Sequence, residues 1–234
     1  MGHARVLLVE DDASIRRFVA LALEELPIEL VEATTLAEAE AVLAQGPVRL
    51  LLSDLMLPDG NGVALLQALA ADPARRAGAR LAAFSAGISA ERRAQLQAIG
   101  VDEVLAKPVA LDALEACVRR ALEGAAPAAV APAPAGDPVA TYFGGNAALY
   151  EAFRASCALQ FGADLRAGDA AVAAGDLGAL RRLAHSLKSV LLTLGHDDAH
   201  RQALAVETLA HAGSAAQAAA GWALLRAQVA ALAR

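Results

Sequence analysis

The chain has 234 residues, with 20 basic and 26 acidic side chains and a formal net charge of −6. Phosphate backbones bind to basic surfaces, and the sequence contains no basic run, so its composition argues against nucleic acid as a partner. Hydrophobic residues make up 57% and aromatic residues only 3%, which predicts aliphatic, strongly helical cores. The start, MGHARVLLVEDD, does not resemble a signal peptide, and no uninterrupted apolar stretch predicts a membrane span. We therefore expect a cytoplasmic protein without a membrane partner.

Short apolar runs alternate with helical segments through the first half of the chain. The predicted strands are RVLLVE (5–10), IELVEA (28–33), VRLLLSD (48–54), a fourth that ends at AAFSA (82–86), and EVLAKP (103–108). Helical segments include 14–25, 36–44 and 111–122. Continuous apolar strands between helices are typical of a parallel sheet that is covered on both faces. Residues 1–122 are therefore predicted to form a five-stranded α/β domain.

The chain changes character after residue 122. Residues 123–139 consist mainly of Ala, Pro and Gly; their prolines prevent a continuous helix, and their small side chains cannot form a core. We interpret this segment as a semi-extended linker. Residues 140–234 contain only helical periodicities, which are broken at FGAD, AGD, LGHDD and AHAGS. This pattern predicts about four helices, enough for an up-and-down bundle.

Charged and polar side chains follow the predicted strands. Glu10 and Asp11 follow the first strand, Asp54 ends the third, Ser85 ends the fourth and Lys107 ends the fifth. The carboxyl ends of parallel strands share one edge of a sheet, so these side chains should lie together. Clustered carboxylates are costly to bury without a cation, and an all-oxygen ligand set favours Mg²⁺. The alternative is an inert α/β domain whose acidic residues are only helix caps.

Four stretches of this domain resemble the motifs of response-regulator receiver domains. VLLVEDDASIRR, LLSDLMLPDGNG, AAFSA and LAKP match them in order and spacing over about residues 4–122. The resemblance implies a doubly wound, flavodoxin-like fold, with Asp54 as phosphoacceptor and with Ser85 and Lys107 in contact with the phosphoryl group. The Mg²⁺ ligands that it implies are Glu10 through a water molecule, Asp11, Asp54 and the backbone carbonyl of Met56.

Other positions of the domain fit the resemblance or depart from it. Pro58 and Gly62 fit the family's loop after the phosphoacceptor, and the glycine is expected to accommodate a turn that opens the next helix. Val104 and Val109 stand where receivers usually carry aromatic residues, one of which reports phosphorylation through its rotamer. We therefore predict weak or altered structural signalling through residues 88–108, which amide shifts with a phosphoryl mimic would test.

A hydrolase is an alternative of another class. Haloacid-dehalogenase-type phosphatases also use an aspartate nucleophile after a parallel strand, and they also use Mg²⁺. They resemble this chain less, because they need a second aspartate two positions further on as general acid, and that position is Met56.

One helical segment of the second half carries an isolated histidine. Its apolar residues recur at steps of three and four and form a stripe that should be buried: Leu177, Leu180, Ala184, Leu187, Leu191 and Leu194. His185 lies about 100° around the helix from Ala184, near Lys188 and Ser189, and should face outward. A polar face of this kind is ordinarily only solvated. His196 and His200 could form a metal pair, but LGHDDAH looks more like a helix end, a turn and a new N-cap.

The segment GDLGALRRLAHSLKSVLLTLG (175–195) resembles the signature of histidine phosphotransfer (HPt) domains. The downstream Glu207 also fits, and Ser189 departs mildly from the usual glycine. This resemblance covers about residues 141–232 and implies a helical bundle with His185 as an exposed phosphoacceptor. Lys188 would contact the incoming phosphoryl group and favour a neutral imidazole by charge repulsion.

Together, the two halves predict a phosphorelay protein with a receiver domain, a linker and an HPt bundle. No glycine-rich nucleotide-binding loop is present, so we expect a phosphoryl acceptor and transfer protein rather than an ATP-dependent kinase. Its partners would be sensor histidine kinases, other receivers or other HPt proteins. Alternatively, the receiver gates access to His185, or both sites are idle in a scaffold. In the gating case, Asp54→Ala would only alter the rate at which an external receiver labels His185.

Overall fold

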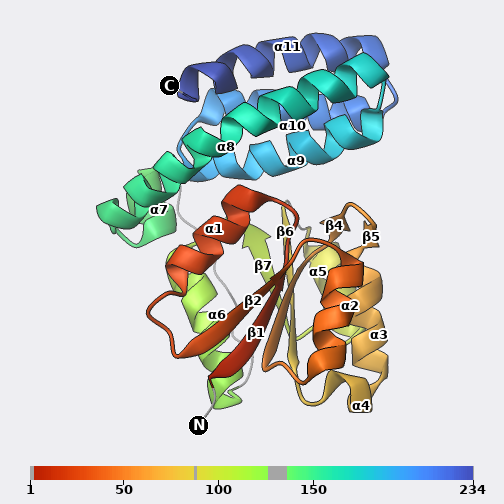
Figure 1. Ribbon diagram of the computed structural model, residues 1–234, viewed down its shortest axis with the longest axis vertical. Coiled ribbons are helices and arrows are strands. Elements are labelled where there is room, and N and C mark those ends of the chain that lie inside the picture. Colours follow the sequence, from red (N-terminus) through yellow and green to blue (C-terminus); the bar gives the residue numbers. More distant parts are fainter. Residues whose placement is uncertain (1–2, 87–88, 126–135, 234) are drawn as a thin grey trace. The chain divides into compact units, whose positions relative to one another are not determined.

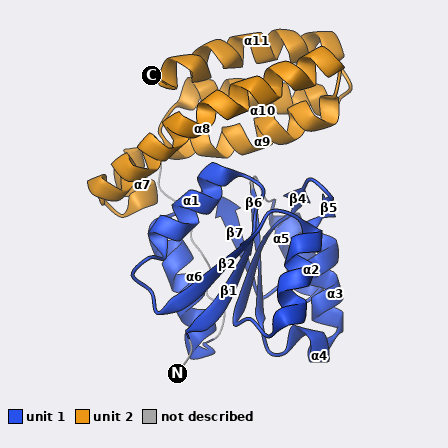
Figure 2. Cartoon of the chain, in the orientation of Figure 1, with its two compact units in different colours: residues 1–135 blue, residues 136–234 orange. Residues whose placement is uncertain are grey.

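The computed structural model describes residues 3–86, 89–125 and 136–233. Contacts divide the chain into unit 1, residues 1–135, and unit 2, residues 136–234 (Figure 2). Residues 126–135, the greater part of the predicted linker, lie outside the described residues. Each unit has a hydrophobic core of its own.

Unit 1 is built on a parallel sheet of five strands in the order β2-β1-β3-β6-β7 (Figure 1). The strands are β1 (Ala4–Val9), β2 (Ile28–Ala33), β3 (Leu50–Asp54), β6 (Arg80–Ala86) and β7 (Glu103–Lys107). The central strands β1 and β3 are rich in leucine and are buried along most of their length, as strands covered on both faces must be. This is the predicted doubly wound, flavodoxin-like fold.

Helices cover both faces of the sheet (Figure 1). One face carries α1 (Ala13–Ala22) and α6 (Leu111–Glu123), and the other carries α2 (Leu36–Gln45), α3 (Gly62–Ala71) and α5 (Ala90–Ala98), with a single short turn, α4 (Pro73–Arg76), after α3. Asp12 caps α1, since its side chain accepts a hydrogen bond of 2.8 Å from the backbone N–H of Ile15.

Between β3 and α3 the chain forms a small antiparallel hairpin that the sequence pattern does not predict. Its strands are β4 (Met56–Leu57) and β5 (Gly60–Asn61), and Met56 pairs with Asn61. Two-residue strands are too short to produce a periodic signal. The hairpin begins two residues after Asp54, so its position bears directly on that side chain.

Unit 2 is entirely helical in its described residues. Its helices are α7 (Pro138–Phe143), α8 (Ala147–Ala174), α9 (Leu177–Thr193), α10 (Asp197–His211) and α11 (Ala215–Leu232). The predicted break at FGAD is wrong, because α8 continues through it. One glycine inside a helix costs only about 1 kcal/mol, and the buried Phe153, Cys157 and Phe161 hold this helix in the core. Within the described residues, no helix is both long and apolar enough to cross a membrane.

The helices α8 to α11 pack in sequence, and α11 closes the bundle against α8. At that closing interface Trp222 of α11 lies on Gly168 of α8, where a Cβ atom would come within 2.0 Å of the indole ring. The indole N–H also donates a hydrogen bond of 3.0 Å to Asp169. The predicted apolar stripe of α9 is buried from Leu180 to Leu194.

Candidate functional site

The strand register of unit 1 brings the polar strand ends together. Asp54 pairs with Phe84, so Ser85 lies one residue further along the next strand, and Lys107 pairs with Ala86. Glu10 follows β1 directly and has no exposed surface, while Asp54 is 2% exposed. The carboxyl edge of the sheet therefore holds the acidic, hydroxyl and basic side chains that the sequence places there.

Three carboxylates form the acidic part of this site. Glu10, Asp11 and Asp54 each offer an oxygen atom, and these atoms lie within 4.8 Å of one another. Burial, partly opposed by Lys107 and increased by the charge of Asp54, raises the pKa of Glu10 to about 8. Burial and Asp54 also raise the pKa of Asp11. An all-oxygen group with two buried members and one half-buried member, whose charges repel one another, has the donor chemistry that a hard divalent cation such as Mg²⁺ requires.

Lys107 is the basic part of the same site. Its ammonium group donates a hydrogen bond of 2.7 Å to Oδ2 of Asp54 and another to Oε2 of Glu10. Burial disfavours the charged ammonium, but the two carboxylates outweigh that effect and raise the pKa of Lys107 above its ordinary value. The Nζ atom also lies 4.8 Å from the centroid of the Phe84 ring. The lysine is thus a permanent, buried positive charge beside Asp54.

Backbone groups orient the Asp54 carboxylate from its other side. Its Oδ1 atom accepts hydrogen bonds from the N–H of Leu55 and, at 3.1 Å, from the N–H of Met56. Gly62 lies directly against this segment: a Cβ atom there would come within 1.9 Å of the backbone oxygen of Asp54. The sequence pattern explains the glycine here by a turn. The close approach of two backbone segments is the stronger reason, since it already excludes a side chain at this position.

The two valines that replace the usual aromatic residues are both buried. Val104 is 2% exposed and belongs to the hydrophobic core with Leu96, while Val109 is 5% exposed. A small β-branched side chain in the core has no large ring to swing between two rotamers. Altered signalling through this face stays a prediction.

In unit 2, His185 and Lys188 lie one turn apart on α9 and both contact Glu207 of α10. His185 Nδ1 lies 2.6 Å from Oε1 of Glu207, and Lys188 Nζ donates a bond of 2.6 Å to Oε2. Burial opposes ionisation of Glu207, but the hydrogen bonds with His185 and Lys188 outweigh it and lower the pKa of Glu207 to about 2. A single carboxylate therefore bridges the two side chains.

The bridge also determines which nitrogen of His185 is free. An ionised carboxylate can only accept hydrogen bonds, so Nδ1 carries the proton that it donates to Glu207. Nε2 has no hydrogen-bond partner among the described residues. In the neutral ring Nε2 is therefore a buried nitrogen with a lone pair that no described donor occupies.

The histidine is less exposed than the helical pattern predicts. His185 is 8% exposed, whereas its place off the apolar stripe predicts an outward-facing ring. Part of this difference comes from α10, since Glu207 lies against Nδ1. Periodicity within one helix cannot show what a neighbouring helix places beside its polar face.

The other histidines of this region have structural positions. His196 immediately precedes α10, as the interpretation of LGHDDAH predicts, and Nδ1 of His200 lies 2.8 Å from the backbone oxygen of Lys188. Within the described ranges, one group of three or more side chains is suited to hold a metal ion, and it consists of Glu10, Asp11 and Asp54 in unit 1.

The chain thus combines a doubly wound α/β unit, with acidic side chains and a buried lysine at its carboxyl edge, with a helical unit that carries a histidine beside a lysine. Two family models match the chain: response regulator receiver domain over residues 6–119 and Hpt domain over residues 149–234. The chain therefore carries a receiver domain followed by an Hpt domain, which is the predicted architecture.

Individual relatives match the receiver half. The KDP operon transcriptional regulatory protein KdpE of Escherichia coli K12 is 36% identical over 119 residues, which are 50% of this chain and 50% of KdpE. The response regulator protein PilR of Pseudomonas aeruginosa is 30% identical over 122 residues, 52% of this chain and 27% of PilR. The chain thus spans half of KdpE and about a quarter of PilR. The chemotaxis response regulator CheY4 of Vibrio cholerae has 24% identity and a TM-score of 0.47, over 51% of this chain and 98% of CheY4.

Proposed function

We propose that this protein passes phosphoryl groups through two sites: Asp54 of the receiver, which accepts one in the presence of Mg²⁺, and His185 of the Hpt domain, which carries one to or from a receiver aspartate. The observation that supports this most directly is the carboxyl edge of the sheet, where the Lys107 ammonium is bonded to Asp54 within an acidic cluster. The partners would be sensor histidine kinases, other receivers or other Hpt proteins.

At the receiver, a carboxylate oxygen of Asp54 forms a bond to phosphorus while the phosphorus–nitrogen bond of a donor phosphohistidine breaks. The donor nitrogen leaves with the electron pair of that bond. The Lys107 ammonium would neutralise charge on the phosphoryl oxygens, and the Ser85 hydroxyl would donate a hydrogen bond to one of them. Mg²⁺, held by Glu10 through water, Asp11, Asp54 and the carbonyl of Met56, would supply further charge neutralisation.

At the Hpt domain, Glu207 holds the proton on Nδ1 of His185 and thereby leaves Nε2 as the nucleophile. A neutral imidazole is nucleophilic near its ordinary pKa of about 6.5, so the domain needs no separate base. Lys188 lies on the same face, where it can exchange its bond to Glu207 for a phosphoryl oxygen. The histidine is presented by one domain and the remaining catalytic groups belong to a receiver.

The test is to incubate the full chain with Mg²⁺ and a labelled acyl phosphate and to examine the stability of the label. Label on Asp54 is lost in base, and label on His185 is lost in acid. Asp54→Asn should abolish the base-labile label, with Asp72→Asn as the matched control because the Asp72 side chain caps α4 and makes no contact with the acidic cluster. A wild-type chain that takes up no base-labile label would contradict the role of Asp54.

A second experiment tests the histidine with a phosphorylated receiver as donor. His185→Gln should abolish the acid-labile label, whereas His200→Gln should retain it, since His200 contacts the backbone of α9 and not the bridge. Equal labelling of wild type and His185→Gln would place the phosphoryl group elsewhere. Loss of the acid-labile label in Asp54→Asn, when acyl phosphate is the only donor supplied, would indicate that His185 receives its phosphoryl group from Asp54.

A further inference from the structure

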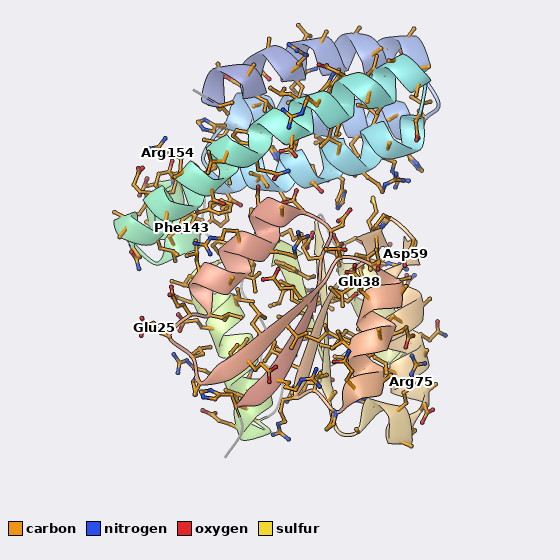
Figure 3. All side chains as sticks on the ribbon, in the orientation of Figure 1. Glu25, Glu38, Asp59, Arg75, Phe143 and Arg154 are labelled. Carbon is orange, nitrogen blue, oxygen red and sulfur yellow. The ribbon has the colours of Figure 1, made fainter. Side chains whose placement is uncertain are left out.

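The side chain of Asp59, which has no part in the chemistry above, connects the β4–β5 hairpin to the start of α2. Its Oδ1 accepts a hydrogen bond of 2.9 Å from the N–H of Leu36, and its Oδ2 accepts one of 3.0 Å from the N–H of Ala37. Leu36 is separated from Asp59 by 23 positions in the chain. Figure 3 shows Asp59 beside Glu38 at the first turn of α2. One carboxylate therefore joins two segments that the chain itself does not connect.

Two residues from separate segments, Thr35 and Asp59, share the capping of the N-terminus of α2. The first N–H groups of a helix have no partner inside it, and a negative charge there is favoured by the helix dipole. Thr35, the N-cap residue of α2, accepts at 3.1 Å from the N–H of Glu38 only, so the N–H groups of Leu36 and Ala37 depend on Asp59. The bond from Leu36 lowers the pKa of Asp59 below its ordinary value.

The hairpin is also in close contact with α2 through its second strand. A Cβ atom at Gly60, the residue after Asp59, would come within 2.7 Å of a methyl group of Leu36. A glycine at this position allows the hairpin backbone to lie against the first residue of α2. Packing and hydrogen bonding thus hold the same end of the hairpin.

The other end of the hairpin holds the phosphoacceptor. Met56, the first residue of β4, donates its N–H to Oδ1 of Asp54 at 3.1 Å and pairs with Asn61 of β5. The hairpin therefore lies between α2 and the Asp54 carboxylate, with a hydrogen-bonded contact on each side. A movement of the hairpin away from α2 would carry the Met56 N–H with it.

We propose that Asp59 is a positioning residue for phosphorylation of Asp54: by anchoring the hairpin to the start of α2, it holds the Met56 backbone in place to orient the Asp54 carboxylate. This inference rests on the proposed function of Asp54. Asp59 itself touches no reacting atom, so its effect is on the rate of phosphoryl uptake and not on the binding of the donor.

The test compares Asp59→Ala and Asp59→Asn with Thr35→Ala in the full chain. Thr35→Ala is the matched control, because it removes a cap of the same helix without touching the hairpin. The maximal rate at which acyl phosphate labels Asp54 should fall about tenfold in Asp59→Ala. The acyl-phosphate concentration that gives half of the maximal rate should stay unchanged. Asn keeps one acceptor and loses the charge, so its labelling rate should lie between those of Ala and wild type.

Hydrogen exchange supplies a readout that a merely structural cap would not move. The Met56 amide should exchange about tenfold faster in Asp59→Ala, while in Thr35→Ala it should stay within about twofold of wild type. If both variants change the labelling rate and Met56 exchange equally, Asp59 is only a helix cap and the inference fails. If wild type itself takes up no label on Asp54, the proposed function fails instead, whatever the variants do.

Discussion

Gly62 is the position where one methyl group should disturb the receiver site most. In Gly62→Ala the new Cβ atom would lie 1.9 Å from the backbone oxygen of Asp54 and 2.8 Å from the hydroxyl of Ser53, where Cβ atoms in proteins keep at least 3.0 Å. The first turn of α3 or the end of β3 must therefore move by about 1 Å. Both are backbone segments, so no side-chain rotation relieves the contact.

Two magnitudes follow from that displacement. Overpacking of this kind costs about 1–3 kcal/mol, and replacement of glycine returns about 0.4–1 kcal/mol through the unfolded chain, so unit 1 should lose about 1 kcal/mol of stability. A displacement of about 1 Å at a reacting group costs about 100-fold in rate, so phosphorylation of Asp54 should slow by about that factor.

The two units can be followed separately in one urea titration. The chain has a single tryptophan, Trp222, which lies in unit 2, so tryptophan fluorescence follows that unit alone. Backbone amide signals of the strands follow unit 1. Gly178→Ala is the control, since it places a methyl group in the first turn of α9 with only the side chains of Asp176 and Arg182 nearby.

The expected result is a lower urea midpoint for unit 1 in Gly62→Ala, an unchanged fluorescence transition, and slow labelling by acyl phosphate. Gly178→Ala should leave the midpoint of unit 1 and the labelling rate as in wild type. Wild-type stability together with wild-type labelling in Gly62→Ala would refute the argument from close approach, because the backbone would then have absorbed the methyl group without moving Asp54.

Three further predictions concern buried groups of both units. Glu207 has a folded-state pKa of about 2 against an ordinary 4.5, so its contribution to stability is present above about pH 4.5 and is lost as pH falls toward 2. In Glu207→Gln, the stability of unit 2 measured by fluorescence should therefore depend less on pH over that range. An equal pH dependence in wild type and variant would argue against the bridge to His185. Gly168→Ala would drive a methyl group into the Trp222 ring and should destabilise unit 2 by about 1–3 kcal/mol, seen as a lower fluorescence midpoint; an unchanged midpoint would contradict this packing. Burial raises the pKa of Cys117 to about 12, so at pH 8 an alkylating agent should modify this thiol only after unfolding, and rapid modification of the native chain would disprove its burial.

Local sequence patterns were sufficient for most of the fold. Apolar runs between helical segments place the strands of unit 1 to within about two residues, because a strand buried on both faces leaves little choice of side chain. The predicted break at FGAD was wrong because the pattern weighs only local cost. Gly162, the glycine of FGAD, costs the helix little, and the packing that outweighs this cost involves buried residues at several turns of α8. The hairpin after β3 was missed because its strands are only two residues long.

The sequence by itself determined which side chains meet at the sheet edge, because parallel strands end together and each polar residue follows its strand by position alone. It also determined that Lys188 lies one helical turn from His185. Only the tertiary structure decided that Glu207 bridges those two side chains, that Asp59 caps α2, and that Gly62 must lack a side chain. The physical reason is distance along the chain: Glu207 lies 22 positions from His185, and packing between separate elements, not local periodicity, brings such residues within hydrogen-bonding distance.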